Sequence, residues 1–121
     1  KKHIIRASLE AIAFQVEDLL KCISKDIKKP IKELYVDGGA TNNKFLMQFQ
    51  ADISNLKIFK PHNIESTSLG VGIMSGLKAG IWKNMNEIIS NKNIEYIYRS
   101  EIGENERKNK IKGWNTAIKK I

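Results

Sequence analysis

Apolar side chains recur at every third or fourth position through the first 27 residues of this 121-residue chain. The spacing places them along one side of an α-helix, so the sequence predicts a long amphipathic helix over residues 3–27. Proline cannot continue a helix, and Pro30 marks where this one has ended. No N-cap residue precedes the helix, so we expect the chain to be a fragment of a larger protein. We expect one row of its side chains to be buried: Ile5, Leu9, Ile12, Val16, Leu19, Leu20, Ile23 and Ile27.

Helical and extended segments alternate along the rest of the chain. Short apolar runs predict strands at residues 33–37, 56–59 and 94–98, and Pro61 closes the second of them. Helical periodicity predicts helices over residues 42–53, 67–81 and from 104 onward, with a weaker turn of helix over 85–89. This order is typical of an α/β domain in which helices cover a layered, partly parallel sheet. At this length we expect one domain over residues 1–121.

Composition argues against several classes of protein. The formal net charge is +8, but it comes from 18 lysines and 3 arginines scattered along the chain. Nucleic-acid readers rely on arginine and interleaved aromatics, so we expect no nucleic-acid partner. No stretch approaches the ~20 apolar residues of a membrane-spanning helix, and we expect no membrane partner. The one cysteine, Cys22, is expected to be a small buried residue, and so low a cysteine content fits a reducing, cytoplasmic setting.

The stretch VDGGATNN, residues 36–43, places two glycines between a predicted strand and a predicted helix. A helix N-terminus offers unsatisfied N–H groups and partial positive charge, and Gly38 and Gly39 would let a nucleotide approach the backbone closely. Thr41 or Asn42 is expected to cap the helix, and Asn43 to point from its first turn toward the ligand. The alternative is a plain strand-to-helix turn that needs a positive φ.

A second set of glycines, Gly72, Gly76 and Gly80, recurs at every fourth position. We expect them to lie on one helix face and to allow close packing against a sheet or another helix. The run GVGIMSG, residues 70–76, lacks the glycine spacing of a dinucleotide-binding fingerprint and lies within a helix rather than after a strand.

Other side chains offer little chemistry. His3 and His62 have no Cys or carboxylate at ligand spacing, so we predict no metal site. Asp37, at a strand end beside the glycine turn, would either hydrogen-bond the turn or reach a bound metal through water. The carboxylates of the first helix are expected to be solvated: Glu10, Glu17 and Asp18.

Four segments together carry a resemblance to a known family. They are HIIRASLEAIAFQ (residues 3–15), VDGGATNNKFLMQFQADI (36–53), ESTSLGVGIMSGLKAGIW (65–82) and GWNTAIKK (113–120). The set resembles the FGGY carbohydrate kinase family. FLMQFQAD is similar to the branch that phosphorylates glycerol rather than to the branches that use xylulose or gluconate.

The resemblance implies an actin-like ATPase (ribonuclease H-like) fold, with residues 1–121 as a C-terminal nucleotide-binding lobe fragment of a two-lobe kinase. It implies transfer of a phosphoryl group from Mg-ATP to glycerol, with ATP and Mg²⁺ as cofactors. Gly39 and Asn43 would contact the nucleotide, and Gly38 and Ala40 would complete the turn.

The resemblance also implies that the catalytic base and the polyol-binding residues lie outside this chain, so that the fragment alone is inactive. Its partners would be the remaining lobe of the same kinase and further copies in a homo-oligomer. Two alternatives stay open: the lobe of another FGGY sugar kinase, and a basic binding module without catalysis.

Overall fold

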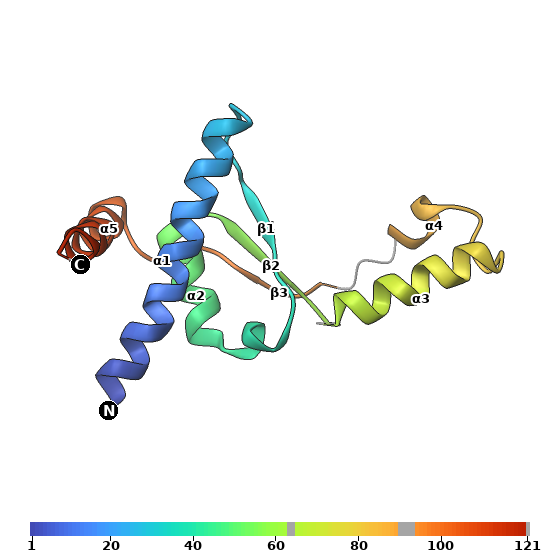
Figure 1. The fold of residues 1–121 in the computed structure, drawn as a ribbon, viewed down its shortest axis with the longest axis horizontal. Coiled ribbons are helices and arrows are strands. Elements are labelled where there is room, and N and C mark those ends of the chain that lie inside the picture. Colours follow the sequence, from blue (N-terminus) through green and yellow to red (C-terminus); the bar gives the residue numbers. More distant parts are fainter. Residues whose placement is uncertain (63–64, 90–93, 121) are drawn as a thin grey trace.

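The computed structural model of the protein describes residues 1–62, 65–89 and 94–120. Its elements alternate as the sequence predicts, and Figure 1 shows their arrangement. The helices are α1 (Lys2–Asp26), α2 (Lys44–Ser54), α3 (Ser66–Lys78), α4 (Met85–Ile89) and α5 (Glu104–Ile118). The strands are β1 (Glu33–Tyr35), β2 (Lys57–Pro61) and β3 (Ile94–Tyr98), and a 3₁₀ turn, η1, covers Gly39–Asn42.

The three strands form one mixed sheet in the order β1-β2-β3. Strand β1 runs parallel to β2, with Leu34 opposite Ile58, and β3 runs antiparallel to β2, with Tyr98 also opposite Ile58. The register shifts between Lys60 and Pro61, where the proline ends β2. The predicted partly parallel sheet is therefore confirmed.

Aromatic side chains from three helices pack together at the core. Phe14 of α1 meets Phe49 of α2 edge to face, with ring centroids 5.5 Å apart. Trp114 of α5 stacks on Phe14 with ring centroids 5.2 Å apart, and its indole N–H donates to Asp18 at 2.8 Å. Burial of such a side chain contributes about 1.5–3 kcal/mol. These contacts hold α1, α2 and α5 together beside the sheet.

The predicted buried row of α1 is largely wrong. Ile5 and Leu19 are 63% and 58% exposed, and the buried positions of α1 are Ala13, Phe14, Glu17 and Leu20. The helix carries apolar side chains on two sides, and the side with Phe14 is the one that packs on α2.

Two further expectations for α1 are corrected. Cys22 is exposed rather than buried. Glu17 is buried rather than solvated and pairs with Lys21 at 3.2 Å. Burial raises the pKa of the Glu17 carboxyl, an effect that the neighbouring Lys21 ammonium partly offsets.

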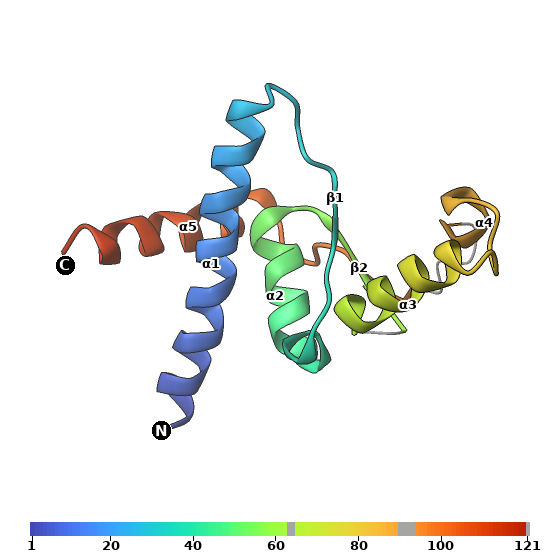
Figure 2. The same cartoon turned by 45° about the vertical axis from the view of Figure 1, so that its right-hand side comes forward.

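Helix α3 extends away from the sheet as an arm, with α4 beside its outer end, in both Figure 1 and Figure 2. It ends at Lys78, earlier than predicted, because Gly80 takes a positive φ of 76° and Ile81 N–H closes the helix on Gly76 O at 2.9 Å. Gly80 thus ends the helix instead of lying on its face.

The predicted packing of the glycine face against a sheet or another helix is also wrong for the described residues. Gly76 lies against the ring of Trp82, and Gly72 faces open space.

Candidate functional site

The glycine turn lies where the chain leaves the sheet and enters α2. Val36 N–H still bonds to Phe59 O at 3.1 Å beside β2, and the chain then turns at Gly38. Gly38 has φ 84° and ψ 167°, a combination that residues with a Cβ rarely adopt. Its carbonyl accepts from both the backbone N–H of Thr41, at 3.1 Å, and the Thr41 hydroxyl, at 2.7 Å. Gly38 is therefore required by the turn itself.

Gly39 differs from its neighbour. It is exposed, its φ is not in the left-handed region, and a Cβ built on it would meet no heavy atom of the described chain within 4 Å. The turn therefore presents bare backbone to solvent at Gly39 and Ala40, directly before the N-terminus of α2. A flat group can lie against it there.

The cap of α2 is Asn43, not Thr41 or Asn42 as predicted. Asn43 has extended backbone angles, φ −80° and ψ 96°, and its side-chain Oδ1 accepts from Leu46 N–H at 3.1 Å. The 3₁₀ turn uses Thr41 and Asn42 internally, which moves the start of the helix to Lys44. The cap occupies Oδ1 and leaves the Asn43 amide N–H₂ for a ligand.

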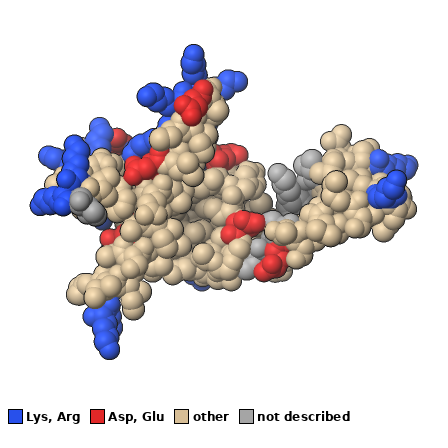
Figure 3. Space-filling model, viewed as in Figure 1, with Lys and Arg blue, Asp and Glu red and all other residues tan. Residues whose placement is uncertain are grey.

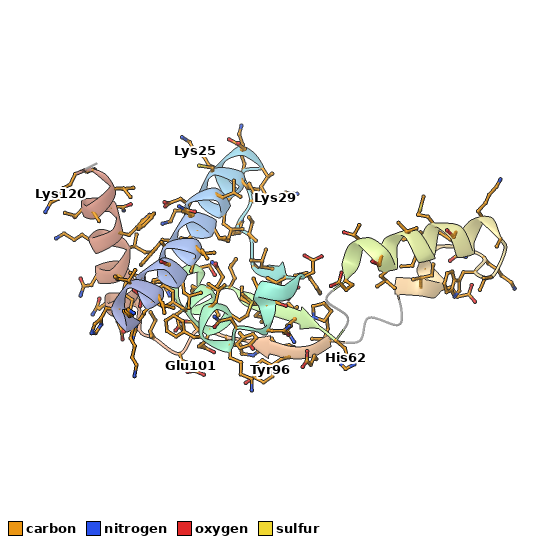
Figure 4. The ribbon with its side chains drawn as sticks, turned by 60° about the horizontal axis from the view of Figure 1, so that its bottom comes forward. Lys25, Lys29, His62, Tyr96, Glu101 and Lys120 are labelled. Carbon is orange, nitrogen blue, oxygen red and sulfur yellow. The ribbon has the colours of Figure 1, made fainter. Side chains whose placement is uncertain are left out.

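A cavity of about 470 Å³ lies beside the turn and is lined by residues of α2, β2 and β3. Thr41 and Asn42 form its wall on the turn side, and none of Gly38, Gly39, Ala40 or Asn43 lines it. The expected nucleotide residues thus gather at the turn, outside this cavity. Tyr96 and Glu101, which border the cavity, are labelled beside β3 and α2 in Figure 4.

The cavity contains a cation that the sequence did not reveal. Lys60 of β2 is 7% exposed and pairs with Glu95 of β3. The hydrogen bond from Lys60 lowers the pKa of Glu95, and burial raises the pKa of the nearby Tyr98 hydroxyl. A single lysine within a strand carries no sequence signal, so only the fold identifies it.

Two polar side chains of α2 fix the chain after β3. Gln48 Nε2 donates to Arg99 O at 2.8 Å and to Asp52 Oδ1 at 3.0 Å, and Glu101 N–H donates to the same Asp52 oxygen at 2.8 Å. Asp52 is 9% exposed, so these bonds are largely shielded from water. They hold the segment that leads from the sheet to α5.

Charge does not converge on the turn. Over residues 1–62, 65–89 and 94–120 no three His, Cys, Asp or Glu side chains are placed to hold a metal ion. Asp37 is exposed and, within the described chain, hydrogen-bonds to nothing, so the expected bond to the turn is absent. Lysine and arginine side chains gather over α5 and the C-terminal end of α1 in Figure 3, and Lys25, Lys29 and Lys120 point outward in Figure 4.

A helix that crosses a bilayer needs about 20 predominantly apolar residues, and the helices of the described residues fall short of this requirement. None of them combines the length and the apolar character needed to cross a membrane.

Several known proteins are similar to this chain in sequence. Residues 1–79 match the C-terminal domain of the FGGY family of carbohydrate kinases. The chain is 46% identical to a glycerol kinase of Mycoplasma capricolum and 45% identical to one of Acinetobacter baylyi, in each case over 99% of this chain. It spans 24% of the length of each of these relatives.

Solved structures agree with these relatives. The structure of Plasmodium falciparum glycerol kinase with ADP matches with a TM-score of 0.87 and 36% identity over 98% of this chain, and this chain covers 24% of that one. A xylulose kinase of Lactobacillus acidophilus, 24% identical, shares the fold with a TM-score of 0.72 over 90% of this chain and 22% of its own. The expected fold class, an actin-like ATPase α/β fragment, is confirmed. The chain belongs to the FGGY family of carbohydrate kinases.

Proposed function

We propose that residues 1–121 are the C-terminal, nucleotide-binding part of a cytoplasmic glycerol kinase that forms a homo-oligomer. The longer enzyme would transfer the γ-phosphoryl group of Mg-ATP to glycerol and release glycerol 3-phosphate and ADP. The observation that carries the proposal is the 45–46% identity to two glycerol kinases over 99% of the chain. The matched Plasmodium falciparum glycerol kinase was solved with ADP, which supports a nucleotide as ligand.

The glycine turn is the proposed contact for the nucleotide. Gly39 would meet it through its backbone, because no part of the described chain covers this position. Asn43 would donate from its amide while its Oδ1 keeps the cap on Leu46. Gly38 and Ala40 shape the turn around them.

In this proposal the chain positions the nucleotide and leaves the proton transfer to residues elsewhere. Phosphoryl transfer depends mainly on holding the phosphates in line with the incoming hydroxyl and on neutralising their charge. Mg²⁺ is commonly bound through substrate phosphates and one or two carboxylates, and no cluster of three possible ligands lies in the described chain. Mg²⁺ would bind together with the phosphates of ATP. The base that takes the proton of the hydroxyl lies outside residues 1–121, and the fragment alone would not turn over.

The first test is ADP release by the longer kinase with Mg-ATP, with and without glycerol, beside xylulose and gluconate. We expect turnover that requires glycerol. Turnover with xylulose or gluconate instead would keep the family and overturn the substrate. Failure of the folded enzyme to turn over any of them, combined with steeply salt-dependent binding to polyanions, would favour a basic binding module.

The second test addresses the turn. We expect Gly39→Val to weaken ATP binding about tenfold or more, because its side chain would occupy the space proposed for the nucleotide. Asn43→Ser keeps an N-cap oxygen and removes the amide, so it should weaken ATP binding without changing the Tm. Gly113→Ala, on the exposed face of α5, is the matched control and should leave ATP binding unchanged. Wild-type affinity in Gly39→Val would contradict the assignment of the turn.

A further inference from the structure

The positive charge of the chain is concentrated in two segments that lie far apart in the sequence. Residues 21–29 and 104–120 hold ten of the 21 Lys and Arg residues and three of the 13 Asp and Glu residues. Their net charge is +7, and the rest of the chain, with 11 basic and 10 acidic residues, contributes +1. The lysines that are scattered along the sequence are therefore unevenly distributed over the fold.

The fold joins these two segments through the contact between α1 and α5. Trp114 of α5 stacks on Phe14 of α1 and donates to Asp18, so α5 crosses α1 one turn before Lys21. In Figure 3 the Lys and Arg side chains of both segments are visible on one side of the molecule. We call the Lys and Arg side chains of residues 21–29 and 104–120 the basic face.

Most of the basic face has no opposite charge beside it. Four of its ten side chains pair with carboxylates of their own helices, namely Lys21, Arg107, Lys108 and Lys110. The other six form no ion pair within the described chain: Lys25, Lys28, Lys29, Lys112, Lys119 and Lys120. A surface with several unpaired cations attracts a partner that carries many negative charges.

The chemistry of the face indicates which polyanion fits it. Nine of its ten cations are lysines, and the side chain of Arg107 is 13% exposed and already paired with Glu104. Nucleic-acid sites use arginine forks and exposed aromatic rings, whereas Trp114, the one aromatic residue of these segments, stacks on Phe14. Flexible lysines are suited to a diffuse layer of charge, such as the headgroups of anionic lipids.

Apolar side chains accompany the lysines at both helix ends. Ile27 lies between Lys25 and Lys28 in the sequence and is 51% exposed, and Ile118, directly before Lys119, is 42% exposed. Lysines beside exposed apolar side chains suit the boundary between headgroups and acyl chains. A bilayer can hold a protein in this way at its surface, without a helix that spans it.

We propose that the basic face binds anionic phospholipid headgroups and attaches the kinase to the surface of a bilayer. The inference rests on the proposed function only in placing this chain within a longer kinase. It needs neither nucleotide nor glycerol, because the basic face shares no residue with the glycine turn.

The test is sedimentation of the longer kinase with vesicles. One set contains phosphatidylglycerol and phosphatidylcholine in equal parts, and the other contains phosphatidylcholine alone. We expect binding to the anionic vesicles that weakens as salt is added, and much weaker binding to the neutral ones. Failure to bind anionic vesicles, or equal binding to both sets, would overturn the inference. Glycerol-dependent ADP release by the same preparation tests the proposed function separately.

A triple variant, Lys25→Gln with Lys112→Gln and Lys119→Gln, removes unpaired charges from both segments of the face. Each lysine near an anionic bilayer strengthens binding several-fold, so we expect the variant to bind anionic vesicles about tenfold or more weakly than wild type. Glycerol-dependent turnover should remain at the wild-type level. Wild-type affinity for the vesicles would contradict the assignment of this face.

The matched control removes the same charge elsewhere. Lys2→Gln, Lys78→Gln and Lys83→Gln change exposed lysines outside the basic face and should leave vesicle binding nearly unchanged. Equal losses in the two triple variants would overturn the inference, because net charge alone would then explain the binding. Tighter binding to double-stranded DNA than to anionic vesicles at the same salt concentration would overturn the choice of lipid as partner.

Discussion

Gly38 and Gly39 are adjacent glycines with different physical requirements, and the same substitution separates them. Gly38 has φ 84° and ψ 167°, a region in which a Cβ collides with neighbouring backbone. Gly39 lies in the 3₁₀ turn without a positive φ, and a Cβ there meets nothing within 4 Å. We therefore expect Gly38→Ala to destabilise the fold and Gly39→Ala to be tolerated.

The size of the difference follows from these geometries. A residue with a Cβ held in the conformation of Gly38 costs about 1–3 kcal/mol. Substitution at Gly39 removes backbone freedom from the unfolded chain and has no steric cost, so it should stabilise by about 0.4–1 kcal/mol. The two alanine variants should then differ by about 1.5–4 kcal/mol in the free energy of unfolding.

Urea unfolding followed by far-UV circular dichroism measures this difference. The two variants have identical composition, which makes each the control for the other. We expect a lower midpoint for Gly38→Ala and a midpoint at or slightly above wild type for Gly39→Ala, with equal slopes. Equal midpoints would refute the reasoning, because they would mean that the turn adopts another conformation in solution.

Three further predictions concern contacts in the core and beside the sheet. Trp114→Phe keeps the aromatic stack but loses the hydrogen bond to Asp18, so it should lower the free energy of unfolding in urea by about 1 kcal/mol. Trp114→Ala loses the stack as well and should lower it clearly more. Equal losses in the two variants would contradict this reasoning. Asp52→Ala leaves two donors without their acceptor and should cost about 1.5–3 kcal/mol, whereas Asp52→Asn, which keeps one carbonyl oxygen, should cost less. Burial raises the pKa of Glu17 above 4.5, so the cost of its charge to folding is absent below pH 4.5 and is fully present once the pH has risen through the raised pKa. Glu17→Gln should therefore increase the Tm more at pH 7 than at pH 4. An equal increase at both pH values would refute this linkage.

Periodicity predicted the helices and strands because it reflects the local geometry of the backbone. The run at 94–98 became β3 and the run at 85–89 became α4, with the expected bounds. The face of α1 that is buried could not be predicted in the same way. Apolar side chains lie on two sides of α1, and the choice between them depends on where Phe49 of α2 lies. Sequence spacing contains no information on that position.

At the candidate site, too, local sequence features were predictable, and features that depend on packing were not. The glycine pair after a strand indicated the turn, since few other residues adopt the angles of Gly38. The cap moved to Asn43 because a 3₁₀ turn intervened, and a difference of one residue in a helix start lies below what composition resolves. Lys60 gave no signal, because its burial depends on β3 pairing beside it and on the carboxylate of Glu95.

Asn43 connects the fold of the turn with its proposed use. Its Oδ1 holds Leu46 N–H at the start of α2, and Leu46 is 4% exposed within the core. Because the cap and the proposed nucleotide contact use different atoms of one amide, the contact requires no rearrangement of the helix. Gly38 sets the direction of the chain into this helix, and Gly39 leaves the adjacent backbone open. The turn is thus formed by the fold before a nucleotide binds, so nucleotide should shift the population of turn conformations very little.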